Sequence, residues 1–483
     1  MSIERINKWV LIVVTLAFGY LFFEQEYGLN VLIFNMLIIT ISLSLKPFLL
    51  NKNSTLATAI ASLISATIVV IINSNVAIVA NAVILLTFIG YNLNPKLSVI
   101  ISLTNGFYSI ATSPFIQLAN HFDVKNSHPN RHTKTSSNQL KWLKIVRVAI
   151  PVLGALVFIS IYANANSAFA ATLEKVNIDF ISWSWVKFNL ISLFLICGVV
   201  YKVQIDHLTN YDNNTGNTIY RKRKEKPPNT HPLALKYELK TGVTLLLVIN
   251  LILLFFNVFD MTYLISDQLP EGFTYSDYVH QGVNTLIGSI ILAIMILLYF
   301  FRSNQNFYKM NKNLKRLAIL WIFQNLILVA GILFKNYAYV VEYGLTYKRI
   351  GVFIYIILAS VGLITTYMKV HKKLNLMFLL RSNTNIAYII LFVMAFFNWD
   401  RIITKVNLNY TQNIDYEYLL NLSDKNLPIL FGQHTENKLS HEQKKRIENR
   451  KTSFIEKYEH SDWQSWNWQD YRITNELKPI SNE

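Results

Sequence analysis

Long apolar runs alternate with short polar connections along most of this chain, from Trp9 to Trp399. A helix that crosses the hydrocarbon of a bilayer needs about 20 largely apolar residues, which is more than most buried core helices contain. The pattern therefore predicts an all-α, polytopic membrane bundle of about eleven or twelve spans. The clearest runs are 9–23, 29–45, 55–73, 75–92, 143–163, 186–204, 241–259, 282–301, 316–334, 349–368 and 384–399.

One further apolar stretch, LSVIISLTNGFYSIATSPFIQL at 97–118, can be interpreted in two ways. Asn105-Gly106 is a turn signal and Pro114 follows, so the stretch could enter the membrane and return. The alternative is an ordinary span with a glycine at a helix contact. If the stretch crosses, the N-terminus moves outside together with Lys46, Lys52 and Lys96. If it returns, every basic connection lies inside, and this is our prediction.

Charge orients the predicted bundle. The loop 260–282, DMTYLISDQLPEGFTYSDYVHQG, is acidic and aromatic, whereas 202–240 and 302–316 are rich in Lys and Arg. Short cytoplasmic loops collect Lys and Arg, so the pattern predicts a cytoplasmic N-terminus and an extracytoplasmic tail. The formal charge of +17 is spread over these loops, and no nucleic-acid-binding module accompanies it, so nucleic acid is not expected as a partner.

The membrane pattern stops near residue 400, which predicts a bundle over 1–400 and a small helical module outside the membrane over 401–483. In this module Asp415 is expected to cap one short helix, and Ser423 or Asp424 the next. A charged helix is expected from Ser440 to Glu459, with Ile447, Phe454 and Tyr458 on one stripe. Trp463, Trp466 and Trp468 need cover, either in the module's own core, which we favour, or at the bilayer interface. Upstream, 164–185 is expected to form an interfacial helix that ends in two tryptophans.

Several short segments, taken in their order and spacing, carry a resemblance. They are FFEQEYGLNVLIFN at 22–35, IYANANSAFAATLEKV at 161–176, LPEGFTYSDYVHQG at 269–282, YGLT at 343–346, DYEYLLNLSDKNLPIL at 415–430 and DWQSWNW at 462–468. Together the chain resembles the bacterial multi-pass membrane family of domain of unknown function 4153/4173. The resemblance implies a protein of the bacterial cytoplasmic (inner) membrane and supplies no catalytic residues.

The interiors of the predicted spans, away from their ends, contain no charged residue and no histidine, which disfavours proton relays and ion-coupled transport. Their neutral polar residues are expected to join helices by hydrogen bonds rather than to line a cavity. These residues are Asn35, Asn81, Asn105, Asn250, Asn257, Gln324 and Asn325. The single cysteine, Cys197, excludes an intramolecular disulfide. The loop histidines His121, His128 and His132 lack the acidic partners of a zinc site, so we expect no metal and no cofactor.

The sequence favours a non-catalytic envelope protein that binds a partner protein, a lipid or a neutral ligand on its outer face, with the tail packed over loop 260–282. Candidate binding residues are Asn105, Gly106, Glu271, Tyr275, Asp277, Trp463 and Trp466. The alternatives are a transferase acting on a lipid-linked substrate, with Glu24 or Glu26 in the first outer loop as its acidic residue, and a transporter of a neutral solute. The lipid bilayer is the one partner that every alternative shares.

Overall fold

A computed structural model describes residues 3–126, 182–220, 234–266, 275–308, 310–411, 413–432 and 439–478, together with four single positions between 158 and 166. Within these residues the chain is helical, and the one β-bridge pairs Thr218 with Leu374. The predicted all-α, polytopic class is confirmed. The elements are α1 (Ile3–Phe22), α2 (Leu29–Leu45), η1 (Pro47–Asn51), α3 (Asn53–Ile72), α4 (Asn75–Tyr91), α5 (Val99–Asn126), α8 (Trp183–Val200), α9 (Asp206–Asn214), α10 (Ala234–Ser266), α11 (Tyr275–Phe300), η2 (Ser303–Phe307), α12 (Lys312–Tyr343), α13 (Tyr347–Lys372), α14 (Leu376–Met394), α15 (Trp399–Tyr410), α16 (Tyr416–Leu420), η3 (Asp424–Asn426), α17 (Leu427–Gly432), α18 (His441–Glu459), η5 (Trp463–Ser465) and α19 (Trp468–Leu477).

Seven described helices are long and apolar enough to cross a membrane. They are Asn53–Ile72, Val99–Gln117, Trp183–Val200, Lys236–Thr262, Lys312–Tyr343, Tyr347–Lys372 and Leu376–Met394. Four shorter apolar helices accompany them, at Asn7–Phe22, Leu29–Leu45, Asn75–Tyr91 and Ile287–Phe300. The number of spans, the orientation and the division at residue 400 remain predictions.

The chain forms two compact units. Unit 1 comprises Met1–Glu26 and Asn105–Gln204, and unit 2 comprises Tyr27–Thr104 and Ile205–Glu483, so α5 is shared between them. In unit 1, α1 packs on α8, with the rings of Phe18 and Phe188 stacked at 5.8 Å. Helix α5 packs on the end of α8, where the Ser109 hydroxyl donates to the Gly198 carbonyl at 2.7 Å. Close helix contacts at small residues are typical of membrane bundles.

Unit 2 contains a three-helix group, α2–α4, joined by amide hydrogen bonds. The amide of Asn35 in α2 donates to Ser62 in α3, and the amide of Asn81 in α4 donates to Ser62 and Ser65 of the same helix. All four side chains are buried, so each bond replaces one that water cannot supply there. The predicted joining role of Asn35 and Asn81 is confirmed.

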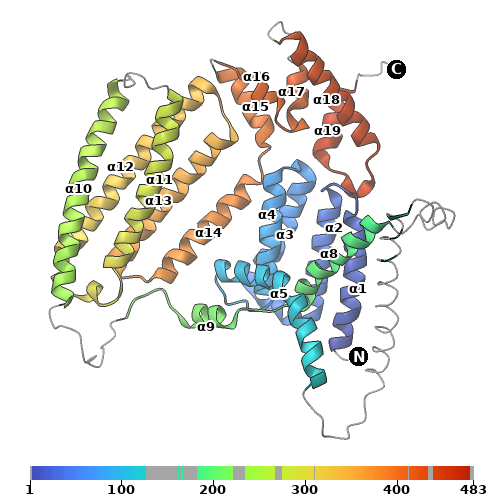
Figure 1. Cartoon of the computed structure of the whole chain (residues 1–483), viewed down its shortest axis with the longest axis horizontal. Helices are drawn as coiled ribbons and strands as arrows, with labels where there is room; N and C mark the ends of the chain where they lie inside the picture. Colours follow the sequence, from blue (N-terminus) through green and yellow to red (C-terminus); the bar gives the residue numbers. More distant parts are fainter. Residues whose placement is uncertain are drawn as a thin grey trace. The chain divides into compact units, whose positions relative to one another are not determined.

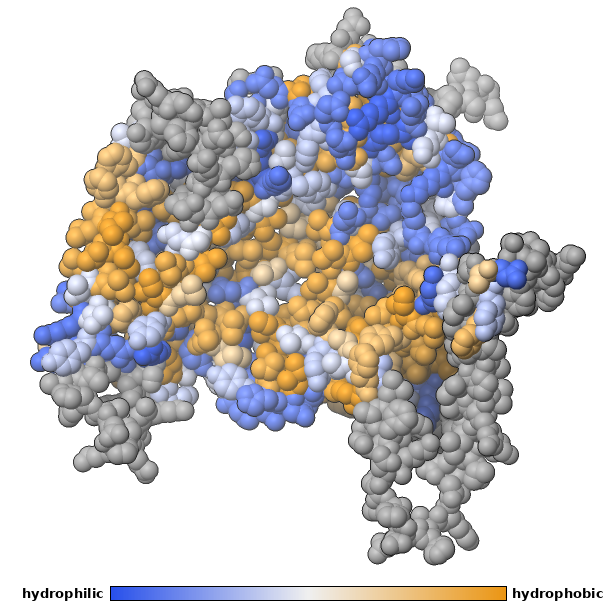
Figure 2. Space-filling view, viewed as in Figure 1, coloured by the Kyte–Doolittle hydropathy of each residue, from blue (hydrophilic) through white to orange (hydrophobic). Residues whose placement is uncertain are grey.

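Helices α10 to α13 form the second group of unit 2 and lie side by side in Figure 1. The amide of Asn250 donates to the Leu317 carbonyl at 3.1 Å, and the amide of Asn257 donates to the Gln324 carbonyl at 3.2 Å. Both partners advance by seven residues, so α10 and α12 run parallel in a fixed register. These bonds confirm the joining role predicted for Asn250 and Asn257. Figure 2 shows hydrophobic residues gathered over this group and hydrophilic ones over the tail helices.

The connections of unit 2 gather at two ends of its helices. At the first, which we call the basic end, the buried carboxylate of Asp212 accepts from Ser98 and from Arg381, at 2.7 and 2.8 Å. Lys46 bonds the Asn92 carbonyl there, and Lys315 bonds the His371 carbonyl. At the second, the tail end, α15–α19 cover the ends of the helices around a core that includes Leu419, Leu427, Ile447 and Ile473.

Several basic side chains lie at the basic end, and the tail end carries others, among them Lys348, Arg349 and Lys425. Those at the basic end include Lys46, Lys52, Lys96, Arg302, Lys312, Lys315, Arg316, Lys369, Lys372, Lys373 and Arg381. The basic connections of both halves of unit 2 thus lie on one side.

Two interpretations of the middle of the chain are wrong. Helix α5 is continuous through Asn105 and Gly106, with Pro114 inside it, so the turn predicted there does not form. Both residues are buried, as the alternative of a glycine at a helix contact requires. Trp183 and Trp185 begin the apolar helix α8 instead of ending an interfacial helix, and most of 164–182 lies outside the described residues.

The acidic loop is shorter than predicted, because α10 extends to Ser266 and α11 begins at Tyr275. Asp260 therefore lies in a helix, where its carboxylate pairs with the ammonium group of Lys335 in α12. The Lys335 side chain is 7% exposed and that of Asp260 is 12% exposed. The apolar runs predict uncharged span interiors, but helices α10 and α12 both extend beyond those runs. Asp260 and Lys335 lie in these extensions and form the buried ion pair.

Candidate ligand pocket

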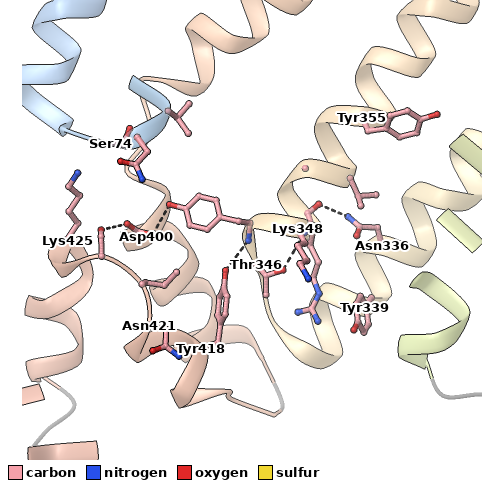
Figure 3. Close-up of a pocket in the computed structure, with 18 of the residues that line it drawn as sticks. Ser74, Asn336, Tyr339, Thr346, Lys348, Tyr355, Asp400, Tyr418, Asn421 and Lys425 are labelled. Carbon is pink, nitrogen blue, oxygen red and sulfur yellow. Dashed lines mark hydrogen bonds between the residues drawn. The ribbon is translucent and has the colours of Figure 1, made fainter. Parts of the chain in front are cut away.

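A pocket of about 1250 Å³ lies at the tail end of unit 2. Its walls come from the start of α4, from α11, from the end of α12, from the first turns of α13, and from the tail segments around Asp400 and 418–425. The pocket thus lies where apolar helices end and the polar tail begins. Figure 3 shows the lining side chains of the membrane-helix ends on one side and those of the tail on the other.

Asp400 connects the two walls. The side chain of Asn398 accepts from the Arg401 amide at 3.2 Å and so begins α15, which places Asp400 in the first turn. A carboxylate in the first turn interacts favourably with the helix dipole. Asp400 is 8% exposed, and its two oxygens accept from the Tyr347 hydroxyl, at 2.7 Å, and from the Ser423 hydroxyl. Both oxygens are therefore used to join the tail to α13.

A second contact between the tail and α13 uses the backbone. Thr346 caps α13 by accepting from the Arg349 amide at 3.3 Å, and the amide of Tyr347 donates to the Tyr418 hydroxyl at 3.1 Å. Burial is the main cause that raises the pKa of Tyr418, so this phenol stays neutral at physiological pH. The tail side of the pocket is therefore held by neutral hydrogen-bonding groups around one carboxylate.

Three cationic side chains line the pocket. Arg349 donates to the Tyr343 carbonyl at 2.8 Å and lies 4.0 Å from the centre of the Tyr339 ring, so its group is committed to the α12–α13 turn. Lys348 is exposed and makes no ion pair with any residue that the structure describes. Lys425 approaches from the tail (Figure 3). Because Asp400 is the single carboxylate among the lining residues, the pocket has an excess of positive charge.

The membrane side of the pocket is largely apolar, with Val76, Ile287 and Val352 among its residues. Gly351 lies on the same wall, and a Cβ atom added there would meet no atom within 4 Å. Two polar atoms of this wall have no hydrogen-bond partner in the part that the structure describes, Oδ1 of Asn336 and the Tyr355 hydroxyl. The wall therefore combines apolar area and open space with unsatisfied hydrogen-bonding capacity.

The site residues predicted from the sequence lie elsewhere. Glu24 and Glu26 are exposed in unit 1, and Asn105 and Gly106 are buried in α5. Trp463 and Trp466 belong to the tail segment that contacts α2. Glu271 lies outside the described residues, as do the side chains of Tyr275 and Asp277, so the packing of the tail over loop 260–282 lies outside them too. None of the six that the structure describes with their side chains is among the residues that line the pocket.

Two of the segments on which the family resemblance rests do meet at the pocket. YGLT at 343–346 supplies Thr346, and the segment at 415–430 supplies Tyr418, Ser423 and Lys425. Another two meet nearby, because the Leu29 amide donates to the Trp466 carbonyl at 2.9 Å. The order and spacing of these motifs was the one feature of the sequence that pointed to the pocket segments. It did not show which of the segments contact one another in the fold.

The described residues contain no group of three His, Cys, Asp or Glu side chains that could hold a metal ion. The side chains of His121, His128 and His132 fall outside those residues. Acid–base or metal chemistry at the pocket would depend on Asp400, whose oxygens are already engaged in structural hydrogen bonds. The one carboxylate of the pocket is thus committed to holding the tail on α13.

Comparison with known proteins gives one match. The family model described as "Domain of unknown function (DUF4153)" matches residues 10–431, which include every residue that lines the pocket. No curated protein and no solved structure matches the chain.

Proposed function

Since the chain belongs to the DUF4153 family, whose description assigns no activity, we propose a function from the pocket itself: the protein binds an amphiphilic molecule with an anionic headgroup. The observation that carries this proposal is the composition of the pocket walls. One wall is apolar and continuous with the membrane helices, and the other is polar and belongs to the tail. An amphiphile is the class of ligand whose two parts match both walls.

The charge of the pocket supports an anionic headgroup. Lys348 and Lys425 face a cavity whose single carboxylate, Asp400, already accepts two hydroxyl donors. Lysine is a common ligand of phosphate as a flexible point charge. The shared chemistry is therefore a phosphate group on a lipid, whether a phospholipid or a lipid-linked intermediate.

The size of the pocket supports more than a headgroup. Pockets for small molecules are typically about 300–1,000 Å³. The volume here, about 1250 Å³, accommodates a headgroup and the first part of an acyl or isoprenoid chain. Val76, Ile287 and Val352 offer the apolar surface along which such a chain would lie.

We place the ligand in the outer leaflet of a bacterial cytoplasmic membrane, as an envelope protein would require. The basic connections around Lys46, Arg302 and Lys373 lie at the opposite end of unit 2, which favours a cytoplasmic basic end and an extracytoplasmic tail. The transferase alternative loses its proposed residues, because neither Glu24 nor Glu26 lines the pocket. No observation favours a transporter of neutral solutes over a binding protein.

The test is direct binding of soluble, short-chain lipids to the purified protein in detergent. Dihexanoyl phosphatidylglycerol should bind, and dihexanoyl phosphatidylcholine, with a compensated charge, should bind at least about tenfold more weakly. Gly351→Leu should abolish binding because its side chain enters open pocket space. Gly288→Leu is the matched control, since a Cβ atom there also meets nothing within 4 Å and Gly288 does not line the pocket.

Lys348→Glu tests the charge without changing the volume, and it should remove the preference for the anionic lipid. Equal binding of the two lipids by the native chain would refute the anionic headgroup. Equal loss of binding in Gly351→Leu and Gly288→Leu would refute the pocket as the site.

A further inference from the structure

The segment 463–471 reverses the usual distribution of polar and apolar side chains between surface and interior. Its aromatic side chains are exposed while the polar ones between them are buried. The exposed fractions are 49% for Trp463, 36% for Trp466, 46% for Trp468 and 40% for Tyr471, against 7% for Gln464, 8% for Ser465, 2% for Asn467 and 4% for Gln469. The prediction that the module's own core covers these tryptophans is therefore wrong. That core is made of aliphatic residues and Phe454.

The buried polar side chains explain why the segment keeps this arrangement. Asn467 caps α19, because its side chain accepts from the Asp470 amide at 2.9 Å and donates to the Asp470 carboxylate at 2.7 Å. The neighbouring helix α18 has the opposite, ordinary pattern, with Ile447 and Phe454 buried and its charged residues outside. The tail thus has one surface suited to water and one that is not.

The aromatic surface is fixed at the level where membrane helices end. The amide of Leu29, the first residue of the apolar helix α2, donates to the Trp466 carbonyl at 2.9 Å. A Cβ atom on Gly28 would overlap the backbone of Ser465 and Trp466, so the two segments are in direct contact. Helix α19 also contacts α3, which is a candidate span.

Tryptophan and tyrosine concentrate at membrane–water interfaces, where an apolar ring with one polar group suits a layer that is partly dry and partly wet. The rings of Trp468 and Tyr471 are neighbours, with centroids 5.5 Å apart. We propose that residues 463–471 insert into the headgroup layer of the leaflet at the tail end and anchor the tail to the membrane. Direct contact with Leu29, the first residue of the apolar helix α2, favours the lipid interface over a partner protein as the occupant.

The experiment measures the depth of this surface in liposomes of phosphatidylglycerol and phosphatidylethanolamine. The native thiol is removed as Cys197→Ala, and a nitroxide is attached to the cysteine of Trp463→Cys or of Trp468→Cys, with the other aromatic residues left in place. Collisions with oxygen, which enters lipid, are compared with collisions with a water-soluble nickel chelate. Glu456→Cys, exposed on α18, is the control for water.

We expect the labels at 463 and 468 to collide several-fold more with oxygen, relative to nickel, than the label at 456. Collision ratios equal to those of the control would overturn the proposal. Exclusion of both quenchers would also overturn it, because a protein surface would then cover the segment.

A second measurement leaves out the labels. Acyl-chain-brominated lipids should quench a larger share of the fluorescence of the native chain than of a variant in which the three tryptophans of 463–468 are leucine. An equal share in both would contradict insertion. Neither experiment depends on the ligand pocket, so either proposal can fail alone.

Discussion

The buried ion pair of Asp260 and Lys335 gives a prediction with a definite magnitude. The two side chains are 12% and 7% exposed and join α10 to α12 within segments long enough to cross the membrane. Removing one partner of a buried pair leaves the other charge in a medium of low polarizability, which costs about 3–5 kcal/mol. Lys335→Met should therefore lower the free energy of unfolding by about 3–5 kcal/mol, or roughly two to four powers of ten in the unfolding equilibrium.

Replacing both partners removes the desolvation cost together with the attraction. The double variant Asp260→Leu/Lys335→Met should therefore unfold within about 1 kcal/mol of the native chain. The measurement is unfolding by sodium dodecyl sulfate in mixed micelles, followed by tryptophan fluorescence. Lys348→Met is the control, because it removes one exposed cation and should change the free energy by no more than about 0.5 kcal/mol. If the effects of the two single substitutions add up in the double variant, the two groups are not coupled and the reasoning fails.

Three other predictions concern the ends of the bundle. In a chain without its native cysteine, an impermeant maleimide applied to intact cells should label a cysteine at Ser461 but not one at Ser303, and the reverse result would overturn the orientation. Gly28→Val should separate the tail from α2 and destabilise the protein by about 2–4 kcal/mol through overlap and one lost hydrogen bond, measured as faster amide exchange in 28–31; unchanged exchange would contradict it. Arg381→Met should cost about 3 kcal/mol, because it leaves the Asp212 carboxylate, whose side chain is 2% exposed, without its cation, and a loss within 0.5 kcal/mol would refute this.

The features that the sequence predicts correctly are those that follow from the length and periodicity of its apolar runs. The class, the positions of most apolar helices, the charged helix of the tail and the cap at Asp415 are confirmed, and the charged helix begins with a capping box at Ser440. The buried stripe of Ile447 and Phe454 is confirmed as well, and Tyr458 is half-buried on it. These features depend on residues close together in the chain, so local patterns suffice to predict them.

The remaining features depend on contacts that local patterns do not contain. The Asn105-Gly106 turn signal was overridden, because both residues pack inside a continuous helix. Over Val99–Gln117 this helix is long and apolar enough to cross a membrane, as the alternative of an ordinary span requires. The burial of Asn105 and Gly106 depends on packing partners that the stretch itself does not contain.

The pocket was missed for the same physical reason. Asp400 and Tyr347 are separated by 53 positions, and each belongs to a segment that looks like an ordinary helix end. The family motifs indicated the right segments, but charge and aromatic content drew attention to loop 260–282 instead. Which helix ends contact each other depends on how the helices pack in three dimensions. The sequence of a single segment does not contain that packing.

The parallel register of α10 and α12 has a consequence for the synthesis of the chain. Asn250 and Asn257 each bond a carbonyl 67 residues further along, and α11 lies between the two helices in the sequence. At about 5–20 residues per second, α12 follows about 3–13 s after α10. During that interval Asn250 and Asn257 lack the α12 carbonyls to which their amides donate in the folded bundle, and Asn250 has only its bond to Leu246 within α10. A cell must therefore either hold α10 at the insertion machinery or accept a helix that waits in lipid, so the pace of translation past residue 324 becomes part of how this bundle assembles.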